Sequence, residues 1–328
     1  MKRIPALDGW RGIAILLVLI DHARAALHLD QGAGASTGPH GVTLFFVLSG
    51  FLITSRLNFE LQSSGTINLR RFYKQRFFRL MPAAWLYLWF AFLIAMLTPN
   101  RLNGAINCAA ALLLFRNYSH FLVPDSWMTG HFWTLSIEEQ FYIGWPSVMA
   151  FAGARVARWA AAFTAIIIAA HRFYVWNSIS STPFPLVNLE GTQLCADSLL
   201  AGCALALFLP RIRPYLRDWM AFPLIAALAA CVMRYHTVMP LHESLIMAFL
   251  LAITSSSHSR VFSLLDWKLV AFLGKISYSL YLWQQPLTTF AEKGPGHFLI
   301  AVVALPCMAL GSYYFIEKPF IERGRRKS

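Results

Sequence analysis

Long apolar runs alternate with short polar segments along the whole chain. A helix needs about 20 residues to cross the hydrocarbon core of a bilayer. Ten runs approach that length, at residues 10–27, 41–57, 80–98, 135–152, 159–176, 191–209, 218–236, 241–257, 270–289 and 297–316. A further run, 104–116, is too short for a complete crossing, and strand-like alternation is rare. The pattern predicts an all-α, polytopic transmembrane helical bundle of about ten spans, with 104–116 as a short re-entrant or interfacial helix.

Basic residues gather in the connections on one side of this arrangement. Lys2 and Arg3 precede the first run, and the carboxy-terminal tail "EKPFIERGRRKS" is basic as well. The connection 56–79 has one acid, Glu60, against Arg56, Arg70, Arg71, Lys74, Arg76 and Arg79. Because connections rich in Lys and Arg stay in the cytoplasm, we expect both termini there. No internal repeat or low-complexity linker interrupts the chain, so residues 1–328 are predicted to form a single membrane domain.

Composition agrees with a membrane protein and accounts for the net charge. The chain is 57% hydrophobic and only 13% charged, whereas soluble domains have about 25% charged residues. A net charge of +13 would suit nucleic-acid binding, but the bases lie where membrane topology requires them. We therefore expect contacts with membrane lipids and no nucleic-acid partner. The five cysteines lie in apolar segments without a CxxC pair, which predicts reduced packing residues.

The first apolar run carries side chains that are costly inside a bilayer. The stretch "DGWRGIAILLVLIDHA" contains Asp8, Arg11, Asp21 and His22, and such residues indicate function by default. In a helix, Arg11 and His22 lie within about 20° of one face and about 16 Å apart, with Asp8 within about 60° of both. A neutral histidine is the general base best matched to pH 7. The alternative is that His22 packs or caps near the helix end.

Two adjacent acids, Glu138 and Glu139, begin the fourth run in "FWTLSIEEQFYIGWP". Adjacent helical residues face about 100° apart, so only one of them could easily share a site with His22. A carboxylate there would orient the imidazole and stabilise its charged form. The alternative is that both acids complement the helix dipole.

Further polar side chains interrupt the second, sixth and ninth runs. Ser49 lies in "VLSGF", where Ser and Gly allow close helix packing, although a site role is also open. Asp197 needs a buried partner or lines a cavity. Four residues of the ninth run share one helical face, which we expect to face the protein interior: Ser277, Tyr281, Gln284 and Thr288.

An ordered series of motifs resembles the acyltransferase-3 family of bacterial membrane O-acyltransferases. The family's mark is an arginine, ten residues and a histidine, and Arg11 and His22 fit that spacing. The resemblance continues in order through most of the chain: "GVTLFFVLSGFLIT" (41–54), "RRFYKQRFFRLMPAAW" (70–85), "FWTLSIEEQFYIGWP" (132–146), "DSLLAGCALALF" (197–208), "ISYSLYLWQQP" (276–286) and "FIEKPF" (315–320).

The resemblance implies transfer of an acyl group, expected to be acetyl, from acyl-CoA to a hydroxyl of a carbohydrate or glycoconjugate. It implies His22 as general base, with Glu138 or Glu139 beside it. Acyl-CoA would be a co-substrate, with no tightly bound cofactor, and the protein would lie in the bacterial cytoplasmic (inner) membrane. Because the sequence has no HExxH motif, CxxC pair or EF-hand loop, we expect no metal. Cations that could hold the donor are Arg11, Arg71, Arg76 and Arg79; the simpler role of the last three is anchoring to anionic lipids. Candidates for substrate contact are Asp8, Ser49, Asp197, Tyr281 and Gln284.

The chain departs from the family pattern at two positions. The family often has Asp where Thr43 lies and His where Gln284 lies, so the acceptor or the proton path here is expected to differ. The alternative function is a transporter or flippase for an acyl donor or a lipid-linked sugar, because intramembrane charges serve transporters equally well.

Overall fold

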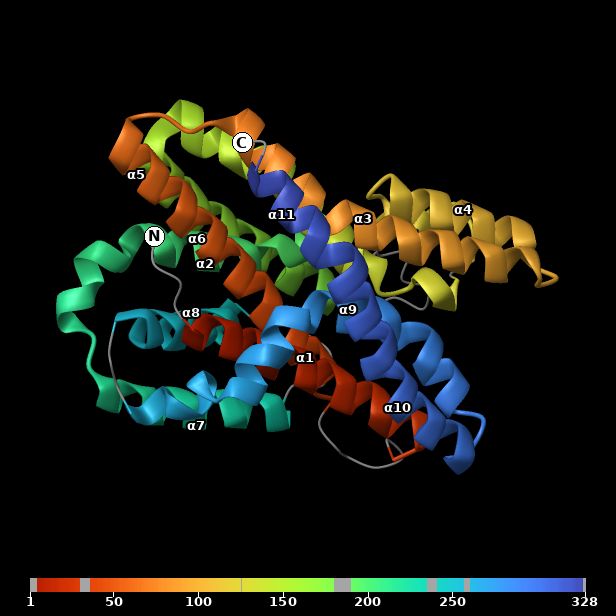
Figure 1. Ribbon diagram of the computed structural model, residues 1–328. Helices are drawn as coiled ribbons and strands as arrows, with labels where there is room; N and C mark the ends of the chain where they lie inside the picture. The colour runs from red at the N-terminus through yellow and green to blue at the C-terminus, as the bar shows by residue number, and fades with distance from the viewer. Residues whose placement is uncertain are drawn as a thin grey trace. The chain divides into compact units, whose positions relative to one another are not determined.

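The computed structural model describes residues 5–29, 36–124, 126–179, 190–234, 241–256 and 260–326. These residues contain helices and no strand, which confirms the all-α prediction (Figure 1). Lys2 and Arg3, used above for topology, lie outside them. The helices are α1 (Pro5–Ala26), α2 (Gly38–Ser64), α3 (Leu69–Met96), α4 (Arg101–Leu112), α5 (Phe132–Ile179), α6 (Thr192–Ile212), α7 (Ala221–Arg234), α8 (Leu241–Ser256), α9 (Lys268–Ala291), α10 (Pro295–Gly311) and α11 (Lys318–Arg326).

Five stretches of the described chain are long and apolar enough to cross a membrane. They are Gly38–Ser64, Leu69–Met96, Trp127–Ser178, Thr192–Tyr215 and Pro295–Arg326. The predicted count of about ten spans is therefore not confirmed. Two further apolar helices, Asp218–Met233 and Leu241–Ser256, are shorter. Helix α1 is long enough but carries Asp8, Arg11, Asp21 and Arg24.

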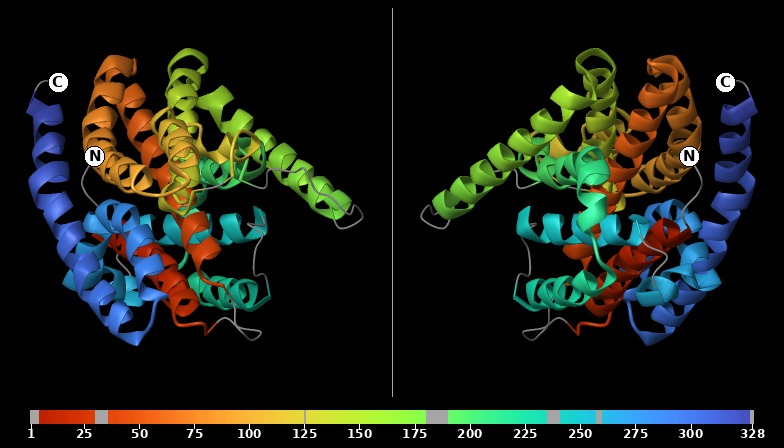
Figure 2. Two further views of the ribbon diagram at one scale, coloured as in Figure 1. Left: turned by 90° about the vertical axis from the view of Figure 1, so that its right-hand side faces the viewer. Right: turned by 90° about the vertical axis from the view of Figure 1, so that its left-hand side faces the viewer.

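Helix α5 joins two of the predicted spans, 135–152 and 159–176. Gly153 breaks it, with φ +74° and ψ 167°. Figure 2 shows the yellow-green ribbon of α5 as two helical segments that run in different directions. Glycine occupies a positive φ without the steric cost that a Cβ would bring. The break falls at the connection that the apolar pattern predicted.

The chain divides into two compact units. Unit 1 comprises residues 1–21, 33–67 and 141–275, and unit 2 comprises residues 22–32, 68–140 and 276–328. Helices α1, α5 and α9 contribute residues to both units.

In unit 1, α2 packs closely against α6 and α8 (Figure 1). A Cβ added to Gly50 would collide with the Leu199 carbonyl, and one added to Gly202 would collide with the Val47 carbonyl. These glycines let the backbones of α2 and α6 approach each other, as small residues do in membrane helix pairs. Close packing in the "VLSGF" stretch is thereby confirmed.

In unit 2, α3 packs against α4 and α11. Its core is aromatic around Tyr87, whose ring contacts Phe132 and Trp283. The run 104–116 becomes the 12-residue α4 and the start of a 3₁₀ turn (Arg116–Phe121). At about 1.5 Å per residue, α4 is too short to cross a bilayer. Burial raises the pKa of the Cys108 thiol on α4 to about 11, which suits the reduced packing role expected of the cysteines.

Candidate functional site

Helix α1 is unbroken from Pro5 to Ala26, so Arg11 and His22 lie on one helix as predicted. Both side chains are half-buried, and so is Asp8. The neighbouring acid, Asp21, accepts hydrogen bonds from Ser36 Oγ at 2.9 Å and from the Thr37 backbone N–H at 2.7 Å. Asp21 therefore fixes the start of α2, which begins just after Thr37.

The two adjacent acids of unit 2 meet a single arginine from α3. Arg76 Nε donates to Glu139 Oε1 at 3.0 Å, and Arg76 Nη2 lies 3.4 Å from Glu138 Oε2. The side chain of Glu139 is more buried than that of Glu138. The sequence suggested one carboxylate beside His22 and one cation for a donor phosphate. These contacts bind the three side chains to one another, and the contact of one carboxylate with His22 stays a prediction.

A small pocket adjoins this arginine–carboxylate cluster. It spans about 320 Å³ of space between atoms, part of which is open solvent at its mouth. Glu139 and Tyr278 are the polar side chains in a wall that is otherwise apolar and includes Leu80, Ala84 and Phe132. Tyr278 Oη donates to the Leu80 carbonyl at 2.8 Å. The pocket offers an apolar slot beside one carboxylate.

The other two arginines proposed for the donor lie elsewhere on α3. Arg71 is exposed in the first turn of the helix, where its backbone N–H is capped by Asn68. Arg79 is half-buried. An exposed guanidinium near a helix start is compatible with phosphate binding and equally with lipid headgroups.

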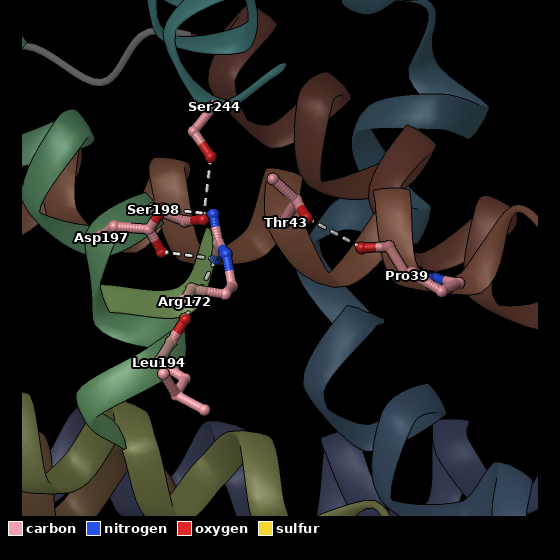
Figure 3. Close-up of polar contacts among 7 residues, drawn as sticks. All are labelled: Pro39, Thr43, Arg172, Leu194, Asp197, Ser198 and Ser244. Carbon is pink, nitrogen blue, oxygen red and sulfur yellow. Dashed lines mark hydrogen bonds and ion pairs between the residues drawn. The ribbon is translucent and has the colours of Figure 1, made fainter. Parts of the chain in front are cut away.

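Asp197 has the buried partner that its position requires, and the partner is Arg172. Arg172 Nη1 and Nη2 contact the two carboxylate oxygens at 2.9 and 2.7 Å (Figure 3). Arg172 also donates to the Leu194 carbonyl, and the adjacent Ser198 hydroxyl bonds to Ser244 Oγ at 2.8 Å. Such bidentate geometry compensates the desolvation of both charges. Asp197 is therefore engaged in holding α5 to α6.

Two other polar residues of unit 1 also lie inside the protein. Ser49 is buried on α2, beside the closely packed Gly50. Thr43, where the family often has Asp, is fully buried and donates to the Pro39 carbonyl one turn earlier at 2.9 Å (Figure 3). Its hydroxyl is satisfied locally by the backbone of its own helix.

Unit 2 contains the predicted polar face of the ninth run. Ser277, Tyr281 and Gln284 are buried on α9 and Thr288 is half-buried, so most of this face points into the protein. Tyr281 Oη hydrogen-bonds to Thr134 Oγ1 at 2.7 Å and donates to the His131 carbonyl at 3.1 Å. Gln284 has neither amide atom in a hydrogen bond.

The sequence interpretation missed His131. It lies immediately before α5 in unit 2, 5% exposed, and its ring contacts Tyr87 and Tyr281 at centroid distances of 5.2 and 5.5 Å. His22 belongs to the same unit and is close enough to interact with His131 electrostatically. One feature of the sequence could have pointed to this residue: His131 directly precedes the "FWTLSIEEQ" motif.

The described residues contain no cluster of three or more His, Cys, Asp or Glu side chains that could hold a metal ion. The polar groups that the structure brings together in the regions above are imidazoles, carboxylates, guanidiniums, hydroxyls and neutral amides.

Comparison with known proteins identifies a family and several relatives. The family described as an acyltransferase domain matches residues 4–317. The chain is 30% identical to YrhL of Bacillus subtilis (strain 168), whose name assigns it provisionally as a peptidoglycan O-acetyltransferase, over 99% of this chain and 56% of that protein. It is 29% identical to the peptidoglycan O-acetyltransferase OatA of Listeria monocytogenes, over 98% and 56% of the two chains.

A third relative is the O-acetyltransferase OatA of Staphylococcus aureus (strain NCTC 8325 / PS 47), 27% identical over 98% of this chain and 58% of that protein. The chain thus spans just over half the length of these curated relatives. No solved structure matches the chain significantly.

Proposed function

Since the chain belongs to the acyltransferase-3 family, we propose that it is an integral-membrane O-acetyltransferase that uses acetyl-CoA and acts on a carbohydrate of the bacterial cell envelope. The relatives that carry peptidoglycan in their names support a carbohydrate acceptor. The distribution of basic residues supports insertion in the cytoplasmic membrane with both termini inside.

The observation that carries this proposal is the unbroken helix α1 with Arg11 and His22 on one face. The two side chains are about 16 Å apart along the helix, a separation that suits the long pantetheine arm of coenzyme A. Arg11 would hold the donor, and His22 would act at the thioester.

In the proposed reaction, His22 accepts the proton of the acceptor hydroxyl as the hydroxyl oxygen attacks the thioester carbonyl. A new C–O bond forms and the C–S bond breaks. Coenzyme A leaves as the thiolate and takes the proton back from the imidazolium. The products are the acetyl ester and free coenzyme A. A transient acetyl-histidine is the covalent variant of the same step.

The cationic segment of α3 supports a donor site on the cytoplasmic side. Arg71 and Arg79 are the cations that we propose for the phosphates of coenzyme A. Arg76 is held by Glu138 and Glu139. We therefore propose that the acid pair positions Arg76, and the contact of one of these carboxylates with His22 stays part of the proposal.

The test is acetyl transfer by the purified protein in lipid. Wild type, His22→Ala and His171→Ala would be incubated with labelled acetyl-CoA and de-O-acetylated envelope glycan. His171 is an exposed histidine on α5 and serves as the matched control. We expect free thiol and labelled glycan from wild type and His171→Ala, and neither product from a folded His22→Ala.

The alternative, a transporter or flippase, gives a different result. A transporter would move unmodified donor or glycan into vesicles without releasing thiol. Transport by wild type without any labelled glycan would contradict the enzymatic proposal.

A further inference from the structure

Unit 2 contains a group of buried polar atoms without hydrogen-bond partners. They are His131 Nδ1 and Nε2, Trp283 Nε1, both amide atoms of Gln284, and Gln285 Oε1. The four side chains are between 1% and 7% exposed. A buried polar atom left unpaired costs stability, so native proteins nearly always pair such atoms with protein, water or ligand. Six of them from two neighbouring segments indicate a site for a polar occupant.

Hydrogen bonds hold the two segments together. Tyr281 donates to the His131 carbonyl, and Trp127 Nε1 donates to the Gln285 carbonyl at 3.1 Å. A Cβ added to Gly130 would lie 3.5 Å from Gln285 Nε2, so that amide lies beside the turn that carries His131. Gln284 follows Tyr281 by three residues on α9, which places both side chains on one helical face.

A proline inside α9 leaves one backbone carbonyl near the cluster without its usual helical hydrogen bond. Pro286 lies inside α9 and has no backbone N–H, so it cannot bond to the Leu282 carbonyl in the usual helical way. His131 packs beside the Leu282 backbone, although neither ring nitrogen reaches a hydrogen bond of good geometry. The side-chain atoms without hydrogen-bond partners thus lie close to the point where Pro286 interrupts the backbone hydrogen bonding of α9.

The chemistry of this group fits neutral hydroxyls. An imidazole and two primary amides can each donate and accept hydrogen bonds, as a sugar hydroxyl does. Tyr87, Tyr281 and Trp283 supply aromatic surfaces around them; the Tyr87 and Trp283 rings lie 5.4 Å apart. A phosphate would instead call for cations such as those of α3.

We propose that His131, Gln284 and Gln285 form the subsite that binds the carbohydrate acceptor, with His131 hydrogen-bonding the hydroxyl that receives the acetyl group. This inference rests on the proposed function. His22, the proposed base, interacts electrostatically with His131 within the same unit. Gln284, where the family often has His, would then adjust which acceptor this chain takes.

The test separates acceptor binding from stability in two matched variants. Gln284→Leu removes an amide whose two polar atoms have no partner. Gln140→Leu removes an amide from the same unit that donates to the Leu114 carbonyl at 2.7 Å and to Asn117 Oδ1 at 3.1 Å. Both proteins would be assayed with acetyl-CoA and de-O-acetylated peptidoglycan glycan fragments, and their melting temperatures would be measured in the same detergent.

We expect Gln284→Leu to raise the acceptor KM about tenfold, with the acetyl-CoA KM unchanged and the melting temperature unchanged or slightly higher. Gln140→Leu is expected to lower the melting temperature and leave the acceptor KM unchanged. His131→Phe should raise the acceptor KM and lower kcat, and His131→Asn should restore part of the acceptor affinity because it returns a donor and an acceptor.

Two outcomes would overturn the inference while leaving the proposed function intact. An unchanged acceptor KM in Gln284→Leu and His131→Phe would mean that water alone occupies the cluster. A raised acetyl-CoA KM with an unchanged acceptor KM would assign the cluster to the donor arm. If wild type itself gave no labelled glycan, the proposed function would fail, and the inference would fail with it.

Discussion

Two buried polar regions of this protein differ in how their atoms are paired. The unit 1 polar network comprises His40 and Glu243, Arg172 and Asp197, and Ser198 and Ser244, each pair joined at 2.7–2.9 Å. Glu243 Oε2 has no partner in that network. The unit 2 polar cluster, His131 with Trp283, Gln284 and Gln285, has six atoms without partners.

The difference separates two uses of polar residues inside a membrane protein. Paired groups compensate one another's desolvation and fix how helices pack. Unpaired groups cost stability in the free protein and recover it when a ligand pairs with them. We therefore interpret the unit 1 polar network as structural and the unit 2 polar cluster as a binding site. The following variants test this comparison, starting with the largest expected effect.

Arg172→Met should destabilise the protein most, because it leaves the fully buried Asp197 charge without its partner. Breaking a buried pair from one side costs about 3–5 kcal/mol, whereas replacing both partners by apolar residues is often nearly neutral. Denaturation in detergent of Arg172→Met and of the double variant Arg172→Met/Asp197→Leu measures this. Equal losses in the two proteins would contradict a structural ion pair.

Glu243→Leu should have a smaller effect, since it removes only the 2.7 Å contact between His40 Nδ1 and Glu243 Oε1. The expected loss of unfolding free energy is about 1–3 kcal/mol. Glu243→Gln keeps an oxygen for His40 Nδ1 and should retain most of the stability. Loss of acetyl transfer in a stable Glu243→Gln protein would move this pair from the structural to the functional region.

Thr43→Val should cost about 1 kcal/mol or less, because the Thr43 hydroxyl bonds only to a carbonyl of its own helix among the contacts described here. The acceptor KM is expected to stay at the wild-type value. A large rise in that KM would show that the position contributes to the acceptor site despite its local hydrogen bond.

Gln284→Leu should have the smallest effect on stability and is the sharpest contrast with Arg172→Met. Removing two unpaired buried atoms leaves no partner unsatisfied, so the unfolding free energy should stay the same or rise by about 1 kcal/mol. Thermal and chemical denaturation in the same detergent give the value. A marked loss of stability would mean that the amide is paired in the working protein.

Much of the fold could be predicted from hydrophobic periodicity alone. The apolar runs anticipated an all-helical chain, the break near Gly153 and a short helix at 104–116. The number of membrane spans was harder to predict from the sequence. Helix α1 combines an apolar composition with four charged residues, and α5 joins two apolar runs. Length and composition cannot separate a crossing from a buried helix in such cases.

The candidate site could be predicted only at positions where a motif or a helical face marks a residue. Burial of Ser277, Tyr281 and Gln284 followed from their spacing on one face of α9. The partners did not follow from spacing. Arg172 is 25 residues before Asp197, and Arg76 is more than 60 residues before the acid pair. Long-range pairing depends on tertiary packing. The lack of hydrogen-bond partners at the His131 ring nitrogens depends on it too.

The most direct test of the comparison is the thermal stabilisation of the protein by glycan. A ligand that binds only the folded state raises the melting temperature, and the rise grows with the ratio of the free ligand concentration to its Kd. We predict that de-O-acetylated glycan fragments at one fixed concentration stabilise wild type and Gln140→Leu markedly more than Gln284→Leu, while acetyl-CoA stabilises all three proteins equally. Equal stabilisation of all three proteins by the glycan would contradict the assignment of the unpaired polar cluster to acceptor binding.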